Sequence, residues 1–352
     1  MSLTNTLTVP QPLRIAAVTR KPQSASYAQR VLGYVPLLAE QNIQVTPLTL
    51  PKGFIGQHCF LTTLKQFDAV WWHRHQLTFP HLSRLKRHAR VLVFDFDDPV
   101  IFSSKKGGEN SITRRIRFSR LLRQCDAAMP ASGYLQQLVL PYCSQTTIMP
   151  MAIDLPDNPT ADRQSTGKIQ LLWLGSRSTQ IYLDQIRPAL EQIGSSSLPI
   201  QLRLVAHEPM TFGNLEVDFR KWSPQQQDNA LRECHIGLCP MPDTKWTRGK
   251  CPFKVIQYMA HGMPWIGSAV GENMTSAGDP LKQPTGLCAG SIEQWGDAIT
   301  QLVSNASHRH DMGQAGIEHV KCHHDRKGLA RTLGNFWHQI CDSPIPHKIK
   351  TP

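Results

Sequence analysis

Short apolar runs alternate with stretches of helical periodicity along most of the chain, and this alternation restricts the folds available to it. In the first half, the apolar runs that predict strands lie at residues 13–18, 43–48, 69–72, 91–95, 126–129 and 146–149. Helices are expected between them, at residues 26–40, 56–66, 79–88, from about 111, and at 132–140 with Ser132 as N-cap. Strands separated by helices are typical of parallel α/β sheets.

A proline-rich stretch divides this pattern into two halves. Pro150, Pro156 and Pro159 alternate with acidic and amide residues, a composition typical of a linker. Beyond it, strands are expected at 168–174, 199–205, 235–239 and 265–270, and helices at 180–193, 224–234, 252–261, 291–303 and twice within 308–340. The sequence therefore predicts two α/β domains, residues 1–152 and 153–325, each with its own sheet.

The composition is that of a soluble globular protein. Of the 352 residues, 40% are apolar and 18% are charged, and no apolar run reaches the length of a membrane span. The N-terminus lacks the charged and apolar regions of a signal peptide, so we expect a cytoplasmic protein. A formal net charge of +12 indicates attraction to a negative partner, such as a nucleotide, a nucleic acid or an anionic membrane surface.

Arginines gather on the helix expected from about Ser111. They are Arg114, Arg115, Arg117, Arg120 and Arg123. Two interpretations stay open: a solvated helix face, or contact with a membrane surface or an acceptor. The second would make the protein peripheral to the inner face of a membrane.

Residues 246–273 hold most of the functional information. Arg248 and Lys250 stand just before a helix that Pro252 can open, and cations there are unfavourable unless an anion joins them. On that helix, Lys254, Gln257, Tyr258 and His261 are expected to form a polar side, and Gly262 with Pro264 ends it. A short strand follows and leads into the turn Gly271-Glu272-Asn273. The alternative is a solvated basic loop before an ordinary amphipathic helix.

This stretch resembles a known family. The run R-G-K-C-x-F-K, followed by Q-Y-M-A and G-x-P, is similar to the donor-site segment of the group-1, family-4-like retaining glycosyltransferases. Trp173-Leu174-Gly175-Ser176 and the D-F-D-D element at 95–98 extend the likeness. It implies a GT-B architecture, in which two Rossmann-like domains with parallel sheets face each other across a cleft. It also implies that residues 326–352 form a helix and tail that cross back to the N-terminal, acceptor-side domain.

The resemblance places a nucleotide-sugar donor on the second domain. The implied donor-binding residues are Gly175, Ser176, Arg248, Lys250, Lys254, Gln257, Gly271, Glu272 and Asn273. The basic side chains and the Gly175-Ser176 backbone would hold the diphosphate. The chain departs from the family's E-x7-E motif, because Gln257 and Gly249 stand at its two carboxylate positions. Gln257 can still bond a ribose hydroxyl.

Candidate acceptor-side and catalytic residues follow two strands of the first domain. Asp97 or Asp98 could bind an acceptor hydroxyl or act as a base, or could cap the next loop. His73 could orient the acceptor or contact the transferring sugar. A D-x-D metal site at 95–97 is a weaker interpretation, because basic residues and helix ends meet phosphate charge in this architecture. A zinc site is a further weak interpretation, suggested by His319, Cys322, His323 and His324. The sequence shows no second pair of ligands with matching spacing. No cofactor or metal is expected to be required.

The expected activity is sugar transfer, with retention, from a nucleotide-diphosphate sugar to a hydroxyl of a glycan or lipid-linked acceptor. Because the E-x7-E carboxylates are missing, a catalytically silent module that binds a nucleotide, a glycan or a protein partner is the alternative. A sugar-nucleotide epimerase is a third possibility. A nucleic-acid partner is not expected, because aromatic residues do not interleave with the basic ones.

Overall fold

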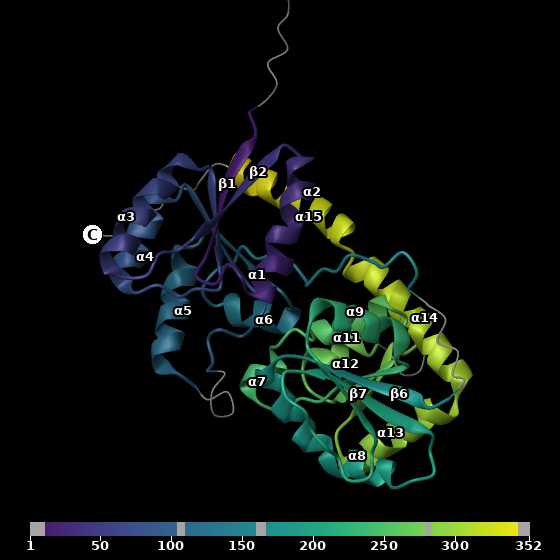
Figure 1. Ribbon diagram of the computed structural model, residues 1–352. Coiled ribbons are helices and arrows are strands. Elements are labelled where there is room, and N and C mark those ends of the chain that lie inside the picture. The colour runs from purple at the N-terminus through teal and green to yellow at the C-terminus, as the bar shows by residue number, and fades with distance from the viewer. Residues whose placement is uncertain (1–10, 104–109, 160–166, 279–282, 344–352) are drawn as a thin grey trace, which may run out of the picture. The chain divides into compact units, whose positions relative to one another are not determined.

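A computed structural model describes residues 11–103, 110–159, 167–278 and 283–343. The chain forms two compact units (Figure 1). Unit 1 comprises Met1–Ile101, Ile112–Met149 and Arg326–Pro352, and unit 2 comprises Phe102–Ser111 and Pro150–Asp325. The last helix, α15 (Arg326–Asp342), therefore belongs to the same unit as the first strand.

Unit 1 is built on a five-stranded parallel sheet with the order β2-β1-β3-β4-β5. Its strands are β1 (Leu13–Thr19), β2 (Ile43–Thr49), β3 (Ala69–His73), β4 (Val91–Phe96) and β5 (Ala127–Pro130). Its other helices are α1 (Ala25–Arg30), η1 (Leu32–Tyr34), α2 (Val35–Ala39), α3 (Phe54–Thr63), η2 (Leu64–Gln66), α4 (Phe79–His88), α5 (Ile112–Gln124) and α6 (Gly133–Val139).

The direction of winding sorts these helices onto two faces of the sheet. The chain moves one way from β1 to β2 and the other way from β2 through β3, β4 and β5. Because such crossovers are right-handed, α1 and α2 lie on one face and α3, α4 and α5 on the other. Helix α15 packs against α2 and η1, and the Trp337 ring lies 5.5 Å from that of Trp71 on β3. The face carrying α3, α4 and α5 has no such additional helix among the described residues.

Unit 2 carries a six-stranded parallel sheet with the order β11-β10-β9-β6-β7-β8. Its strands are β6 (Ile169–Leu174), β7 (Ile200–Ala206), β8 (Val217–Lys221), β9 (Ile236–Cys239), β10 (Trp265–Ser268) and β11 (Gly286–Ala289). Its helices are α7 (Arg177–Gln180), η4 (Ile181–Ile186), α8 (Arg187–Gly194), α9 (Pro224–Glu233), α10 (Lys245–Arg248), α11 (Phe253–Ala260), α12 (Glu272–Ser276), α13 (Ile292–Ser304) and α14 (Ala306–His323).

Two hydrophobic clusters, one on each face, form the core of unit 2. Side chains of α8 and α13 pack with one set of strand residues, and side chains of α9 and α11 pack with the alternate set. The period of two along a strand explains this division, because neighbouring residues point to opposite faces. Within the described residues, no helix is both long and apolar enough to cross a membrane.

Two helices expected to be continuous are each broken into three pieces, and the last piece of each has a proline in its first turn. Residues 26–40 form α1, η1 and α2, and Pro36 lies in the first turn of α2. Residues 180–193 are divided among α7, η4 and α8, with Pro188 in the first turn of α8. Proline tolerates a first turn but clashes with the carbonyl four residues earlier, so the helix cannot run through it.

Other expectations changed at the edges of the sheets. Residues 146–149 form no strand: Thr147 and Met149 donate hydrogen bonds to β5, but the only bridge is at Thr146. Strands β8 and β11 were not predicted, because β8 is half-exposed and mostly polar and β11 has only four residues. Helices α10 and α12 replace the expected loop and turn on either side of α11 and β10.

Candidate functional site

The carboxyl ends of β6 and β9 mark the switch point of the unit 2 sheet. From β6 the chain winds outward through β7 and β8, and from β9 it winds the other way through β10 and β11. The loops that follow β6 and β9 therefore diverge to opposite faces. In open parallel sheets, ligands bind beyond the strand ends at such a switch point.

Lys254, in the first turn of α11, lies at this switch point. Its Nζ is 4.4 Å from the centroid of the Trp173 ring, which belongs to β6. Gly175 directly follows β6, and a Cβ there would lie only 3.0 Å from the same Nζ. A larger residue would push the ammonium group away, so glycine allows the close approach. The structure thus brings together two residues that are far apart in the sequence and were both predicted for the donor.

Lys254 has no counter-ion among the residues that the structure describes. Its side chain is half-buried, and no carboxylate in the described part of the chain pairs with it. Burial lowers the pKa of Lys254 from 10.5 to about 8; Cys239 opposes this shift and the charge of Lys250 adds to it. A partly desolvated cation without a partner is unfavourable until an anion joins it.

Lys250 approaches from the loop between α10 and α11. Its Nζ lies 5.8 Å from the centroid of the Tyr182 ring, at the start of η4. As with Lys254, none of the described carboxylates forms an ion pair with it. Two like charges near one strand end repel each other, and a diphosphate between them would remove that repulsion.

Arg248, by contrast, has an acidic partner. Its Nε and a terminal nitrogen donate to the two carboxylate oxygens of Asp243 at 2.5 and 2.8 Å, and both side chains are exposed. Gly271 packs against its backbone: φ of Gly271 is +53°, and a Cβ there would lie 2.3 Å from the Arg248 carbonyl oxygen. Arg248 and Gly271 are therefore neighbours, but the guanidinium group is already paired.

Three further predicted donor residues differ in how accessible they are. Gln257 is buried on α11, and Glu272 is half-exposed at the start of α12. Asn273 is fully buried, and its amide donates to the carbonyls of Cys239 at 3.4 Å and Ser268 at 3.1 Å. The side chain of Asn273 is therefore committed to joining β9 to β10.

The expected polar side of α11 is wrong at Gln257, Tyr258 and His261, which are all buried. The Tyr258 ring covers Gly237 on β9, and its hydroxyl donates to the carbonyl of Leu238 at 3.2 Å. His261 bonds the Gln257 carbonyl through Nδ1 at 2.8 Å. Because α11 lies directly on the sheet, nearly its whole surface is buried, which a helical repeat of polar residues does not reveal.

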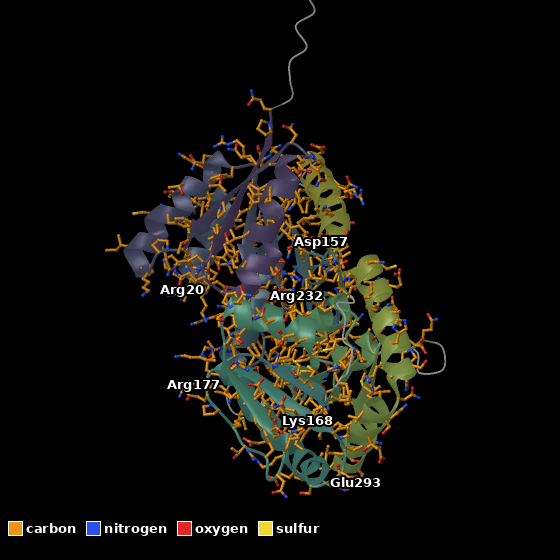
Figure 2. The ribbon with its side chains drawn as sticks, turned by 45° about the vertical axis from the view of Figure 1, so that its right-hand side comes forward. Arg20, Asp157, Lys168, Arg177, Arg232 and Glu293 are labelled. Carbon is orange, nitrogen blue, oxygen red and sulfur yellow. The ribbon has the colours of Figure 1, made fainter. Side chains whose placement is uncertain are left out.

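The backbone of the Gly175-Ser176 turn offers less than expected. The Gly175 N–H donates to the Val205 carbonyl at 3.2 Å and is therefore in use. Ser176 is the N-cap of α7, but α7 has only four residues, so its dipole is short. Arg177 of the same turn projects into solvent (Figure 2).

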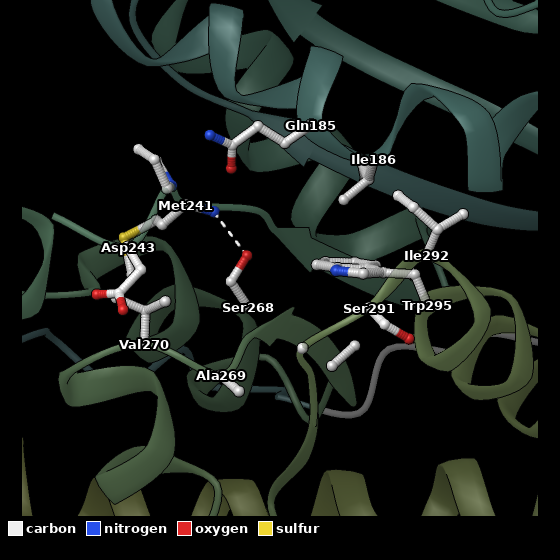
Figure 3. A pocket seen from close by; sticks show the side chains of 13 residues that line it. Gln185, Ile186, Met241, Asp243, Ser268, Ala269, Val270, Ser291, Ile292 and Trp295 are labelled. Carbon is white, nitrogen blue, oxygen red and sulfur yellow. Dashed lines mark hydrogen bonds between the residues drawn. The ribbon is translucent and has the colours of Figure 1, made fainter. Parts of the chain in front are cut away.

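A pocket of about 430 Å³ lies at the carboxyl ends of β9, β10 and β11. Its lining includes Gln185, Met241, Asp243, Ser268 and Trp295, and the Trp295 ring extends into it (Figure 3). The backbone N–H of Met241 donates to Ser268 Oγ at 2.9 Å and fixes one wall. None of the nine predicted donor residues lines this pocket, although it includes Val270, next to Gly271, and Asp243, the partner of Arg248.

In unit 1, His73, Asp97 and Asp98 belong to one hydrogen-bonded network. His73 Nδ1 is 2.7 Å from Asp95 Oδ2, and its Nε2 is 3.1 Å from Ser26 Oγ. Ser26 donates to Asp97 Oδ1 at 2.7 Å. His73 therefore bridges Asp95 on one side and Ser26, with Asp97 behind it, on the other.

Two arginines complete the network. Arg30 is fully buried and bonds Asp95 from Nε at 2.9 Å, and Arg74 contacts Asp97 at 3.3 Å and also Asp98. Burial would raise the pKa of Asp97, but the charges of Arg74, His73 and Arg30 and the bond from Ser26 bring it below its usual value. Each of the three carboxylates thus contacts a guanidinium group, Asp95 through Arg30 and Asp97 and Asp98 through Arg74, which explains how the network stays buried.

The two metal interpretations fall on residues with other partners. Asp95 and Asp97 bond arginine, histidine and serine side chains, as described above. His324 Nδ1 is 2.8 Å from the Met151 carbonyl, and the His319 and His323 rings are 4.7 Å apart. In the described part of the chain, no group of three metal-ligating side chains comes together.

Sequence reasoning gave no role in these sites to Ser26, Arg30 and Arg74. Trp173 was named only as part of the resemblance, and Asp95 only as part of a possible D-x-D metal site. Ser26 and Arg30 lie on α1 and become neighbours of β4 only through the fold, so no local pattern could reveal them. Asp95 gave one signal: a carboxylate inside an otherwise apolar strand needs a buried partner.

No protein-family model and no curated protein matches the sequence. Solved structures with the same architecture do exist. The sucrose-phosphate synthase of Thermosynechococcus elongatus superposes with a TM-score of 0.73 at 16% identity, over 93% of this chain and 99% of that one.

Two other solved structures are similar to this chain, one with a bound nucleotide and one in its apo form. HepE of Anabaena, in complex with UDP, gives a TM-score of 0.67 at 14% identity, over 93% of this chain and 100% of that one. The lipopolysaccharide outer core galactosyltransferase WaaB, in its apo form, gives a TM-score of 0.63 at 10% identity, over 92% of this chain and 99% of that one. At such low identity the likeness shows the fold: the chain has two Rossmann-like α/β domains, as in GT-B glycosyltransferases.

Proposed function

We propose that the chain is a glycosyltransferase that moves a sugar, with retention, from a nucleotide-diphosphate sugar to a hydroxyl of a glycan or lipid-linked acceptor. The observation that carries the proposal is the pair Lys250 and Lys254 beyond the ends of β6 and β9, without a described carboxylate partner. A diphosphate supplies the missing negative charge. The fold supports the proposal, since the HepE structure with the same architecture holds UDP.

In this proposal the two lysines stabilise the leaving group. As the bond from the sugar to the diphosphate breaks, negative charge grows on the diphosphate oxygens. Cations that are already in place and partly desolvated stabilise that charge more than flexible surface lysines would. The Trp173 and Tyr182 rings restrict where the two ammonium groups can lie. Ser176, Gln257, Gly271 and Glu272 are proposed to contact the rest of the donor.

On the acceptor side, His73, Asp97 and Asp98 are proposed to bind and orient the acceptor hydroxyl. The lowered pKa of Asp97 makes it a weak base, which favours a hydrogen-bonding role over proton removal. Asp98, which is half-exposed and contacts Arg74, is the more accessible of the two carboxylates. We assign no protein nucleophile.

No metal is required in the proposed reaction, because two lysines meet the diphosphate charge. The first test is thermal stabilisation of the purified protein by UDP, GDP, ADP and their sugars, with and without a chelator. One nucleotide diphosphate should raise Tm by mass action, and the chelator should not change that shift. A shift that disappears with chelator would contradict the metal-free donor site.

Single variants then locate the site. Lys254→Ala and Lys250→Ala should each remove most of the nucleotide-induced shift. Lys168→Ala is the matched control: Lys168 precedes β6 at its opposite end and pairs with Glu216 in solvent (Figure 2). If all three variants keep the shift, or none of the nucleotides gives one, the proposed site is wrong.

A catalytically silent binding module is the second candidate, and one observation favours it. Gln257 is buried where relatives carry a carboxylate, and Gly249 stands at the other carboxylate position. A silent module would show the nucleotide shift without releasing sugar or nucleotide diphosphate from the donor. Slow donor hydrolysis, lost in Lys254→Ala, would instead support the transferase.

A further inference from the structure

Apolar side chains are exposed together at one edge of unit 1, where α3, α4 and α5 begin. The exposed fractions are 61% for Phe54, 77% for Ile55, 65% for Phe79, 76% for Ile112 and 44% for Ile116. Phe54, Phe79 and Ile112 are the first residues of their helices. Each helix follows a parallel strand, so all three helices begin at the carboxyl edge of the sheet. We call these five residues the α3–α5 rim.

Contacts between the helices show that the rim is continuous. The Phe54 ring lies 4.5 Å from the His81 ring, two residues beyond Phe79 on α4. The Arg120 guanidinium of α5 lies 5.7 Å from the centroid of the Phe79 ring. On α5, Ile112, Ile116 and Arg120 recur every four residues, which places them on one side of that helix. Phe118, Leu121 and Leu122 already fill its buried side.

The charged side chains of helices α3, α4 and α5 have a single sign, because the three helices contain no aspartate or glutamate. Their exposed cations are Arg114, Arg115, Arg117 and Arg120 along α5, with Arg87 and Arg123 in the last turns of α4 and α5. Among the carboxylates that the structure describes, none pairs with Arg115, Arg117 or Arg120. Positive charge thus surrounds exposed aliphatic and aromatic side chains.

We propose that the α3–α5 rim docks unit 1 on the surface of an anionic lipid bilayer. Aromatic and aliphatic side chains would enter the boundary between headgroups and acyl chains, and the arginines would contact lipid phosphates. A nucleic acid would match the arginines, but isoleucine has no face on which a base can stack. An acidic protein would match the charge too, but charge pairing alone gives no role to the five exposed apolar side chains of the rim.

The loss of membrane binding can be estimated for variants in which two residues of one kind are replaced. Each arginine near an anionic leaflet strengthens binding by a factor of about five, so losing two should weaken it about 25-fold. Losing two isoleucines that enter the boundary should weaken it about tenfold or more. Both effects should appear in the partition constant, and the arginine effect should decrease as salt rises.

The test is flotation of the protein with vesicles, without nucleotide or acceptor, so that its result is independent of the proposed transfer. The vesicles are phosphatidylcholine alone, or phosphatidylcholine with an equal share of phosphatidylglycerol. The apolar variant is Ile55→Asn with Ile112→Asn, and the charge variant is Arg117→Gln with Arg120→Gln. The control, Leu32→Asn with Lys327→Gln and Arg331→Gln, changes the face that carries α2 and α15.

The protein should float only with the anionic vesicles, both rim variants should lose binding, and the control should bind normally. The circular dichroism spectrum and Tm of each variant show whether it is folded. Failure of the original protein to float with anionic vesicles would overturn the inference. So would an apolar variant that binds unchanged, or binding to duplex DNA that needs the arginines but not the isoleucines.

Discussion

At the scale of single residues, Lys254 holds a charge that weakens the free protein. Its pKa falls from 10.5 in an unfolded chain to about 8 in the fold. A shift of this size corresponds to about 3 kcal/mol at neutral pH, which residual solvent screening and a cation–π contact of about 1 kcal/mol reduce. Lys254→Met should therefore raise the free energy of unfolding at pH 7 by about 1–2 kcal/mol.

The sign of the pH dependence gives this prediction a second measurement. Between about pH 8 and 10.5 the unfolded chain holds the Lys254 proton and the folded chain does not. The original protein should therefore gain stability relative to Lys254→Met as the pH rises through that window. Urea denaturation of both proteins at several pH values measures the difference. A variant that is less stable at pH 7 would contradict the prediction.

Two glycines should respond in opposite ways to alanine. Gly271 has a φ of +53° and abuts the Arg248 backbone, so Gly271→Ala should lower the free energy of unfolding by about 2 kcal/mol or more. Gly296 lies inside α13 with no atom within 4 Å of an added Cβ, so Gly296→Ala should raise it by about 0.5–1 kcal/mol. Thermal denaturation compares the two; equal effects would show that the tight contact at Gly271 is relieved by movement of the loop.

At the scale of elements, the network around Asp95 joins α1 to β3 and β4. Asp95→Asn leaves the buried Arg30 without its charge partner and should cost about 3–5 kcal/mol. Asp228→Asn, which breaks an exposed pair with Arg232, should cost about 0.5 kcal/mol or less. Equilibrium denaturation measures both. A cost for Asp95→Asn as small as that for Asp228→Asn would mean that water enters the network.

The same network predicts how the protein responds to acid. The pKa values of Asp95 and Asp97 are lowered in the fold from the ordinary value of 3.8, despite burial, by the charges of Arg30 and Arg74 respectively. The stability they contribute is therefore complete above that value and is lost as the pH falls below it. Asp95→Asn should flatten the acid limb of the stability curve. An unchanged acid limb would count against the network.

The sequence predicted elements best where the hydrophobic period agrees with local signals. Helix α4 spans residues 79–88 as expected, and Ser132, Ser223 and Ser291 act as N-caps. Short edge strands such as β8 lack such a signal, because half of each strand faces solvent. The site residues could likewise be predicted where they belong to a continuous motif, but not where the fold brings distant residues together. Lys254 belongs to a continuous motif, but Ser26 meets His73 only after the sheet has formed.

At the scale of the whole molecule, two separate cores predict two unfolding transitions. Helix α15 buries Ala330, Leu333, Phe336, Trp337 and Ile340, and the five together contribute on the order of 10 kcal/mol. That is comparable to the total stability of a domain, about 5–15 kcal/mol. A chain that ends after Asp325 should therefore lose the transition of unit 1 in calorimetry and keep that of unit 2. Two surviving transitions would show that α15 is dispensable.

The return of α15 to unit 1 also sets an order of events during synthesis. Apart from Phe102–Ser111, unit 2 is one uninterrupted segment and can fold as soon as Asp325 leaves the ribosome. The strands of unit 1, which are made before unit 2, must wait with the Trp71 side of their sheet uncovered until α15 arrives. A ribosome that stalls late therefore releases a chain with one finished domain and one open one. Such a chain displays the apolar surface that chaperones and proteases of cellular quality control recognise.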